Sequence, residues 1–141
     1  MGCTARLRLR LSVAVAALLP ALLAAGCGEV WIRYDSGHCG GDPRYAVVVA
    51  FQARGDGQPV ALAATGVVRD GSYSEAMVPV DDRRAPAGRS FELAGGRERA
   101  GVYDVEVETE FGEILNWYRV QVPRDFCGPY TAYLRGSVAR Y

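Results

Sequence analysis

The side chains best suited to covalent chemistry in this chain of 141 residues are four cysteines and one histidine: Cys3, Cys27, Cys39, Cys127 and His38. A cysteine sulfur can be acylated, can form a disulfide or, as the thiolate, can bind a metal. A serine–histidine–acid triad would have to use His38, and no G-x-S-x-G motif presents a serine. Zinc needs three or four suitable ligands, which one histidine and two widely spaced cysteines do not supply. We therefore expect no enzyme activity, no cofactor and no metal site.

Cys27 follows a segment that has the order of an export signal. Arginines at positions 6, 8 and 10 make the start positive, and an apolar run of fifteen residues follows from 11 to 25. This run is shorter than the roughly 20 residues that cross the hydrocarbon core of a bilayer. A positive start, a short apolar segment and then small residues are what translocation and cleavage of a signal peptide require.

The sequence Ala24-Ala25-Gly26-Cys27 resembles the lipobox of bacterial lipoproteins. The resemblance implies that residues 1–26 are removed and that Cys27, acylated with lipid such as palmitate, becomes the first residue. We therefore expect a lipoprotein that the bilayer holds through Cys27, in the bacterial cell envelope, with its domain facing the periplasm or the exterior. Gly28 stands where Asp would resemble an inner-membrane retention signal, which favours the outer membrane in a Gram-negative source.

Other interpretations of the N-terminus remain open. Met1-Gly2-Cys3 is similar to the start of a myristoylated and palmitoylated protein, but Arg6 occupies the position where that motif needs Ser or Thr. An uncleaved membrane anchor would be shortened by Pro20. Cleavage by an ordinary signal peptidase near Ala25 would secrete the protein and leave Cys27 as a free thiol.

Cys39 and Cys127 are the two other thiols of the mature chain. An even pair in an oxidising compartment predicts a disulfide. Closing the loop of about 88 residues between them contributes roughly 4–5 kcal/mol in loop-closure entropy, a substantial share of a total stability of about 5–15 kcal/mol. A reactive or metal-binding pair is the alternative, although neither cysteine lies in a C-x-x-C motif.

Composition limits the size of the protein and its partners. Residues 27–141 number 115, which suits a single domain. They contain thirteen arginines and sixteen acidic residues, a net charge of −3 when His38 is neutral. The sequence has no basic patch of the kind that phosphate contacts require, so we expect no nucleic-acid partner.

From residue 44 onward the pattern predicts strands and turns, with no helical stripe. Residues 45–53 form a nearly continuous apolar run, typical of a buried strand. Residues 102–110 alternate between an apolar and an acidic face, typical of a half-buried strand. Further strands are expected at 60–69, 73–80, 90–94, 114–122 and 130–140, with turns that include Gly95-Gly96.

These seven strands predict an all-β fold, an antiparallel Greek-key β-sandwich, with a small closed barrel as the alternative. The expected domains are a signal peptide at 1–26, a lipidated tether at 27–38 and the sandwich at 39–141. The tether to Cys39 would reach at most about 40 Å. Its residues 30–32 include Trp31 and could pack on the domain.

Strict alternation along 114–122 predicts that Tyr118, Val120 and Val122 face inward. The opposite parity predicts an outward contact patch of Leu115, Trp117 and Arg119. An exposed tryptophan beside a leucine can mark a contact patch, or it can cover a sheet edge or receive Trp31. Arg119 would pair with the outward acidic row on the neighbouring strand (Asp104, Glu106, Glu108 and Glu110).

Several stretches resemble the carboxypeptidase regulatory-like domains. Residues 57–68 are similar to their G-x-P-V…A-x-V opening, residues 69–75 to the hairpin that follows in lipoprotein members, and residues 98–107 to their E-R-x-G-x-Y-x-V-x-V strand. Trp117 and Cys127 also sit where that family places an aromatic residue and a cysteine. The Pro-Gly-Tyr turn of the family is replaced at 111–113, and its frequent His-Val pair at 128–129.

The resemblance spans residues 39–138 and implies a transthyretin-like, seven-stranded sandwich without catalytic machinery. We therefore expect a non-catalytic binding or structural module. The alternative is an accessory subunit that docks on an envelope enzyme or transporter.

Overall fold

The computed structural model describes residues 30–33 by their backbone, and residues 40 and 42–139 in full. Cys27, His38 and Cys39 lie outside the described residues, as does the expected signal peptide. Lipidation and the disulfide therefore stay predictions.

The described residues form an all-β structure of eleven strands, with no helix among them. The larger sheet has, in order across it, β1 (Val30–Arg33), β11 (Thr131–Val138), β2 (Tyr45–Ala53), β6 (Glu92–Arg97) and β5 (Val78–Pro79). A four-stranded sheet has β4 (Tyr73–Ala76), β3 (Ala64–Asp70), β7 (Gly101–Thr109) and β8 (Ile114–Val122). A two-stranded hairpin joins β9 (Arg124–Asp125) to β10 (Gly128–Pro129).

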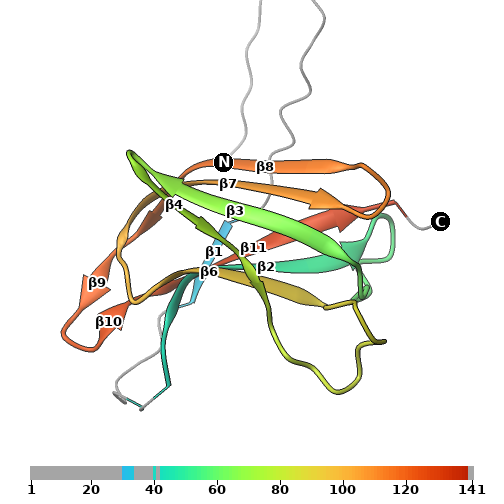
Figure 1. Cartoon of the computed structure of the whole chain (residues 1–141), viewed down its shortest axis with the longest axis horizontal. Coiled ribbons are helices and arrows are strands. Elements are labelled where there is room, and N and C mark those ends of the chain that lie inside the picture. The colour runs from blue at the N-terminus through green and yellow to red at the C-terminus, as the bar shows by residue number, and fades with distance from the viewer. Residues whose placement is uncertain (1–29, 34–39, 41, 140–141) are drawn as a thin grey trace, which may run out of the picture.

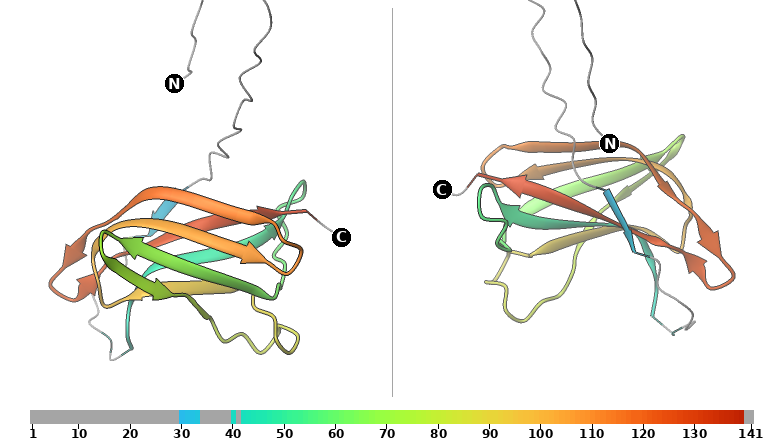
Figure 2. Two further views of the ribbon diagram at one scale, coloured as in Figure 1. Left: turned by 45° about the horizontal axis from the view of Figure 1, so that its top comes forward. Right: turned by 180° about the vertical axis from the view of Figure 1, so that it is seen from behind.

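The two larger sheets form two layers with the hydrophobic core between them (Figure 1; Figure 2). Burial alternates along β7 as its sequence predicts, with Tyr103, Val105 and Val107 inward and acidic residues outward. Most of β2 is buried, as its apolar run predicts. Val68 of β3 and Leu134 of β11 are also fully buried.

Glycines let the two layers approach each other closely. This role explains why the turn predicted at Gly95-Gly96 is wrong. Gly95 and Gly96 lie in β6 rather than in a turn, so this strand continues to Arg97. A Cβ atom on Gly95 would lie 3.1 Å from a methyl of Val68 in the opposite layer. Glycine is therefore a packing residue here, where a side chain would push the sheets apart.

The predicted strand 73–80 is divided between the two layers. β4 pairs with β3, whereas β5 pairs with β6 in the other sheet. The chain changes sheets at Met77, whose backbone N–H donates to Gly66 O at 2.8 Å. Local alternation does not reveal such a change, because the strand keeps its extended backbone on both sides of the crossing.

The prediction of a wholly antiparallel sandwich is wrong at one ladder, since β11 pairs with β2 in parallel. Parallel partners need a long connection, and here nearly the whole domain lies between the two strands. The expected tether also contributes a strand, because β1 pairs with the free edge of β11. A short added strand protects an edge whose backbone groups would otherwise lack partners.

A β-bulge changes the parity of β8. Tyr103 lies opposite Val120 and Val105 lies opposite Trp117, so one residue of β7 faces two of β8. Arg119 takes a positive φ of 56° at this point, and its backbone N–H donates to Asp104 Oδ1 at 2.9 Å. An inserted residue turns the strand, so positions before and after it no longer follow one alternation.

The predicted contact patch is therefore wrong for Leu115 and Trp117, whereas Arg119 is exposed as predicted. Trp117 is only 6% exposed and belongs to the core, with Leu115 packed against that core. Tyr118, predicted to face inward, is 73% exposed. Within the acidic row of β7, Glu106 pairs with Arg69 of β3, whose Nη2 lies 3.8 Å from Glu106 Oε1.

Replacement of Trp117 by alanine should destabilise the protein by about 3–5 kcal/mol, because it removes a large buried side chain and leaves a cavity. Its neighbour Tyr118→Ala is the matched control and should change stability by less than about 0.5 kcal/mol. Urea unfolding of both variants tests this expectation. Equal stabilities would mean that Trp117 does not pack in the core.

Candidate functional site

An open groove of about 500 Å³ lies on the outer face of the five-stranded sheet. Its floor is a row of directly paired residues from four strands: Tyr133, Val48, Ala94 and Val78. Val48 and Ala94 are 7% and 0% exposed, whereas Val78 is 43% exposed. Directly paired residues project on the same side of a sheet, so these four share its outer face, where Val48 and Ala94 are almost fully covered.

Two segments form the walls of the groove. On one side is the chain that enters β2, with Asp42, Pro43 and Arg44. On the other side are β5 and the residues after it, with Asp81. Glu92, at the start of β6, adds a third carboxylate to the lining. The groove thus combines an apolar floor with a rim of three carboxylates and one guanidinium.

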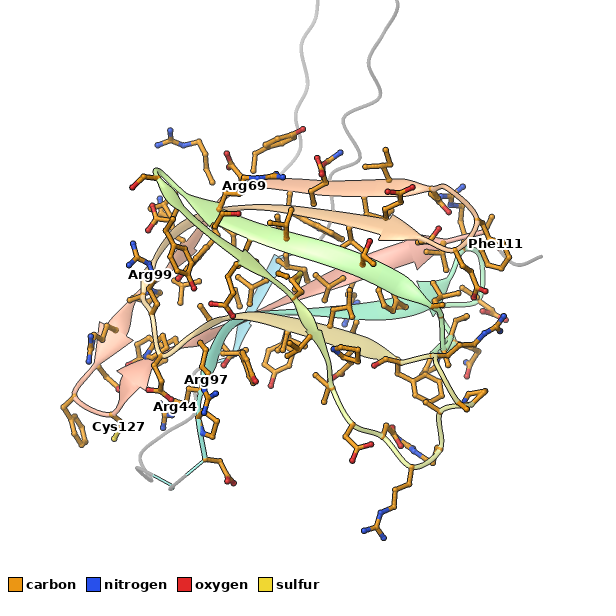
Figure 3. The ribbon with its side chains drawn as sticks, viewed as in Figure 1. Arg44, Arg69, Arg97, Arg99, Phe111 and Cys127 are labelled. Atoms are coloured by element: carbon orange, nitrogen blue, oxygen red, sulfur yellow. The ribbon has the colours of Figure 1, made fainter. Side chains whose placement is uncertain are left out.

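The Arg44 side chain is directed toward the β9–β10 hairpin. Its Nη1 lies 3.9 Å from Asp125 Oδ1, and its backbone N–H donates to Glu98 Oε1 at 2.6 Å. Figure 3 shows Arg44 close to this hairpin, which also carries Cys127. These contacts hold the wall of the groove against the hairpin.

Ser90 holds the backbone of Glu92 in place. Ser90 is 3% exposed, and its Oγ lies 2.5 Å from Glu92 O and accepts the Glu92 N–H at 3.1 Å. Partial burial raises the pKa of the Glu92 carboxyl, and the negative charge of Asp82 raises it further. Hydrogen bonds from Arg84 lower the pKa of Asp82 to about 2, so Asp82 keeps its charge.

A second polar cluster closes one end of the two layers. The Tyr73 hydroxyl donates to the carboxylate of Glu75, and the Arg99 guanidinium lies 4.3 Å from the centre of the Tyr73 ring. Burial and the contact with Glu75 raise the pKa of Tyr73 to about 12. Tyr103 donates its hydroxyl proton to Arg99 O at 2.6 Å. At neutral pH both tyrosines are therefore protonated, and their hydroxyls donate hydrogen bonds that stabilise this end of the two layers.

Of the site residues predicted from the sequence, Cys127 lies in the turn between β9 and β10. Its backbone N–H donates to Asp125 Oδ1 at 2.7 Å. Gly40, next to the expected partner Cys39, lines the same groove as Arg44. A Cβ atom on Gly128 would lie 3.7 Å from Arg44 Cδ, so the two segments are neighbours. This proximity is compatible with the predicted disulfide.

The sequence analysis did not predict the groove. One signal was present, because a strand as apolar as β2 is covered on both faces. Which segments lie over the outer face of Val48 depends on the tertiary fold, and the pattern of a single strand does not carry that information.

Comparison with known protein families, curated proteins and solved structures finds no match to this chain. In the described part of the chain, no three or more His, Cys, Asp or Glu side chains gather as a metal site would require. The residues described also include no helix with the length and apolarity of a membrane span.

Glu92→Gln should raise the melting temperature at neutral pH. The raised pKa means that folding favours protonated Glu92, so its stabilising contribution is complete below the pKa of the unfolded chain. That contribution is lost as the pH rises through the higher pKa of the folded protein. The advantage of the variant should therefore vanish as the pH falls toward 4.

Thermal unfolding followed by circular dichroism from pH 4 to pH 8 measures this difference. Glu108→Gln, an exposed site on β7 with the same change of charge, is the control and should show no such trend. A lower melting temperature for Glu92→Gln at neutral pH would contradict the raised pKa of the Glu92 carboxyl.

Proposed function

We propose that this protein is a lipid-anchored lipoprotein of the bacterial cell envelope, whose domain acts by binding or as a structural module rather than by catalysis. The observation that carries the proposal is the position of β1. This strand begins at Val30, three residues after Cys27, and pairs with β11 from Val30↔Leu134 to Arg33↔Thr131. The residues after the lipobox-like sequence thus belong to the folded domain.

This position shortens the expected connection to the membrane. With β1 in the sheet, only Gly28 and Glu29 separate Cys27 from the domain. Three residue steps span at most about 11 Å, compared with the 40 Å of a tether that runs to Cys39. If Cys27 is acylated, the domain lies against the lipid surface, and its partners are near that surface too.

The finer fold is part of the same proposal: a Greek-key sandwich of the transthyretin-like type, as in carboxypeptidase regulatory-like domains. The support is the alternation of the chain between layers. It passes from β2 to the β3–β4 pair, returns to β5–β6, crosses to β7–β8 and returns to β11. The parallel pairing of β11 with β2 is a departure from the antiparallel arrangement.

Lipidation is tested by labelling cells with a palmitate analogue. Wild-type protein should be labelled, and globomycin should cause its precursor to accumulate, because processing requires the acylated cysteine. Cys27→Ala should lose the label completely. Cys3→Ala is the matched control and should keep it, since Cys3 lies in the segment expected to be removed.

Label that survives Cys27→Ala, or that is lost with Cys3→Ala, would contradict the lipoprotein proposal. The second result would favour acylation near the start of the chain.

An accessory role is the second candidate, and exposed apolar side chains on β8 favour it. Ile114 and Tyr118 are 58% and 73% exposed on this edge strand of the four-stranded sheet. Exposed aromatic and aliphatic side chains on one strand can belong to an interface. They replace Trp117 as the candidate contact residues.

Recovery of one stoichiometric envelope protein from detergent-solubilised membranes would support the accessory role, provided that Tyr118→Ala lowers the recovery at least about tenfold. Phe126→Ala, an 89% exposed side chain on the β9–β10 hairpin, is the control and should leave recovery unchanged. Recovery of no partner would favour the free-standing module, and equal loss in both variants would contradict an interface centred on Tyr118.

A further inference from the structure

We propose that the edge of the sandwich formed by β8 lies on the surface of the lipid bilayer. In this orientation Ile114 and Tyr118 enter the boundary between lipid headgroups and acyl chains, and Arg119 contacts lipid phosphate. The inference rests on the proposed lipid anchor at Cys27 and adds the orientation of the domain to it.

The strands β8 and β1 lie on the same side of the sandwich. Gly136 of β11 faces β8, because an added Cβ atom would lie 3.0 Å from Leu115 Cδ1. Gly95 of β6 faces Val68 of β3 in the same way. β8 therefore stacks on β11, whose outer edge carries β1, whereas β5 forms the opposite edge of that sheet. Figure 1 and both views of Figure 2 show β1 on the side of β8.

The short connection to Cys27 brings the bilayer to this side. β1 begins at Val30, which pairs with Leu134 of β11, and the three residue steps from Cys27 span at most about 11 Å. The β5 edge is about 19 Å from β1, four strand spacings of about 4.8 Å. An acylated Cys27 therefore cannot reach a bilayer that lies against the β5 edge, but it can reach one that lies against the β8 side.

The outer side of β8 carries side chains suited to a membrane interface. Tyr118 and Ile114 are 73% and 58% exposed, and Arg119 is exposed next to Tyr118. The backbone N–H of Arg119 donates to Asp104, whereas its guanidinium pairs with no acidic side chain among the described residues. Tyrosine and arginine suit an interface because their apolar parts lie among lipid chains while the hydroxyl or guanidinium reaches water and phosphate.

The spacing of these side chains favours a flat surface. Ile114 and Tyr118 are four residues apart, about 13 Å along a strand, and the exposed Asn116 lies between them. A protein partner usually covers a contiguous apolar patch. A bilayer is an extended plane, so it receives separate side chains along one edge. This spacing therefore favours lipid over a protein partner at β8.

The acidic row of β7 determines which part of the sheet makes contact. Glu106 and Glu108 lie opposite residues of β8 on the outer side of the sheet. Anionic headgroups repel these carboxylates and attract the basic Arg119. The sheet therefore does not lie flat on an anionic bilayer. Its edge strand β8 meets the lipid, and the acidic row turns toward water.

The test measures how the acylated mature protein is oriented on nanodiscs of phosphatidylethanolamine and phosphatidylglycerol, in which a small fraction of the lipid carries a headgroup spin label. A nearby spin label broadens the NMR signals of backbone amides. Broadening should be strongest along β8, at Ile114, Asn116 and Tyr118. It should be at least about tenfold weaker at Val78, because the effect falls steeply with distance and β5 lies about 19 Å away from β1.

A double variant tests the apolar side chains. Ile114→Ser combined with Tyr118→Ser should lower the broadening at Asn116 at least about twofold, because the bilayer then buries less apolar area at this edge. Val78→Ser, at a 43% exposed site on β5, is the control and should leave the broadening unchanged.

A charge variant tests the contact with phosphate. Arg119→Gln should lower the broadening at Asn116 roughly twofold or more in the anionic discs and should have no effect in discs of phosphatidylcholine alone. Arg83→Gln, at an exposed site in the loop after β5, makes the same change of charge and is the control.

Equal broadening at the β8 and β5 edges, or equal effects of the variants and their controls, would overturn this inference. The lipid anchor would still stand, because the protein would remain on the discs. Capture of an envelope protein that depends on Tyr118, without broadening along β8, would assign the edge to a protein partner and would also overturn the inference. Protein that does not stay on the discs would contradict the anchor itself, and this inference with it.

Discussion

The parallel ladder between β11 and β2 is the interaction on which the rest of this structure depends. It joins the end of the domain to its beginning, from Ala132↔Val47 to Val138↔Ala53. On one side it places Tyr133 beside Val48 and so completes the apolar floor of the groove. On the other side it leaves a free edge of β11 that accepts β1. The groove and the proposed short connection to the membrane therefore share one structural element.

Close packing between the layers makes this arrangement compact. Gly95 of β6 and Gly136 of β11 both face the opposite sheet, where added Cβ atoms would lie 3.1 Å from Val68 and 3.0 Å from Leu115. Every buried side-chain nitrogen or oxygen in the described residues has a hydrogen-bond partner. A close approach of the sheets without buried polar groups lacking partners is what allows a small domain to be stable.

The two acidic surfaces of the protein differ in a way that net charge does not reveal. On the outer face of β7, Arg69 lies beside Glu106, and the backbone of Arg119 donates to Asp104. At the groove, Arg44 lies next to Asp125 instead, so the carboxylates of the rim keep an excess of negative charge above an apolar floor.

The sequence by itself determined the parts of the fold that depend on local periodicity. The alternation of β7 and the apolar run of β2 could be predicted, because burial on one or both faces imposes its period directly on the residues of a strand. It also showed the export-like order of charges and apolar residues before Cys27, which does not depend on the fold.

Tertiary structure decided the features that depend on a partner strand. Trp117 is buried because a bulge, formed where Asp104 of β7 meets β8, shifts the parity of the strand. Gly95 and Gly96 continue a strand because the opposite layer leaves no room for side chains. The groove likewise needs four strands side by side. Each of these features is set by contacts between residues distant in the chain, and a pattern read along one strand at a time contains no information about its neighbours.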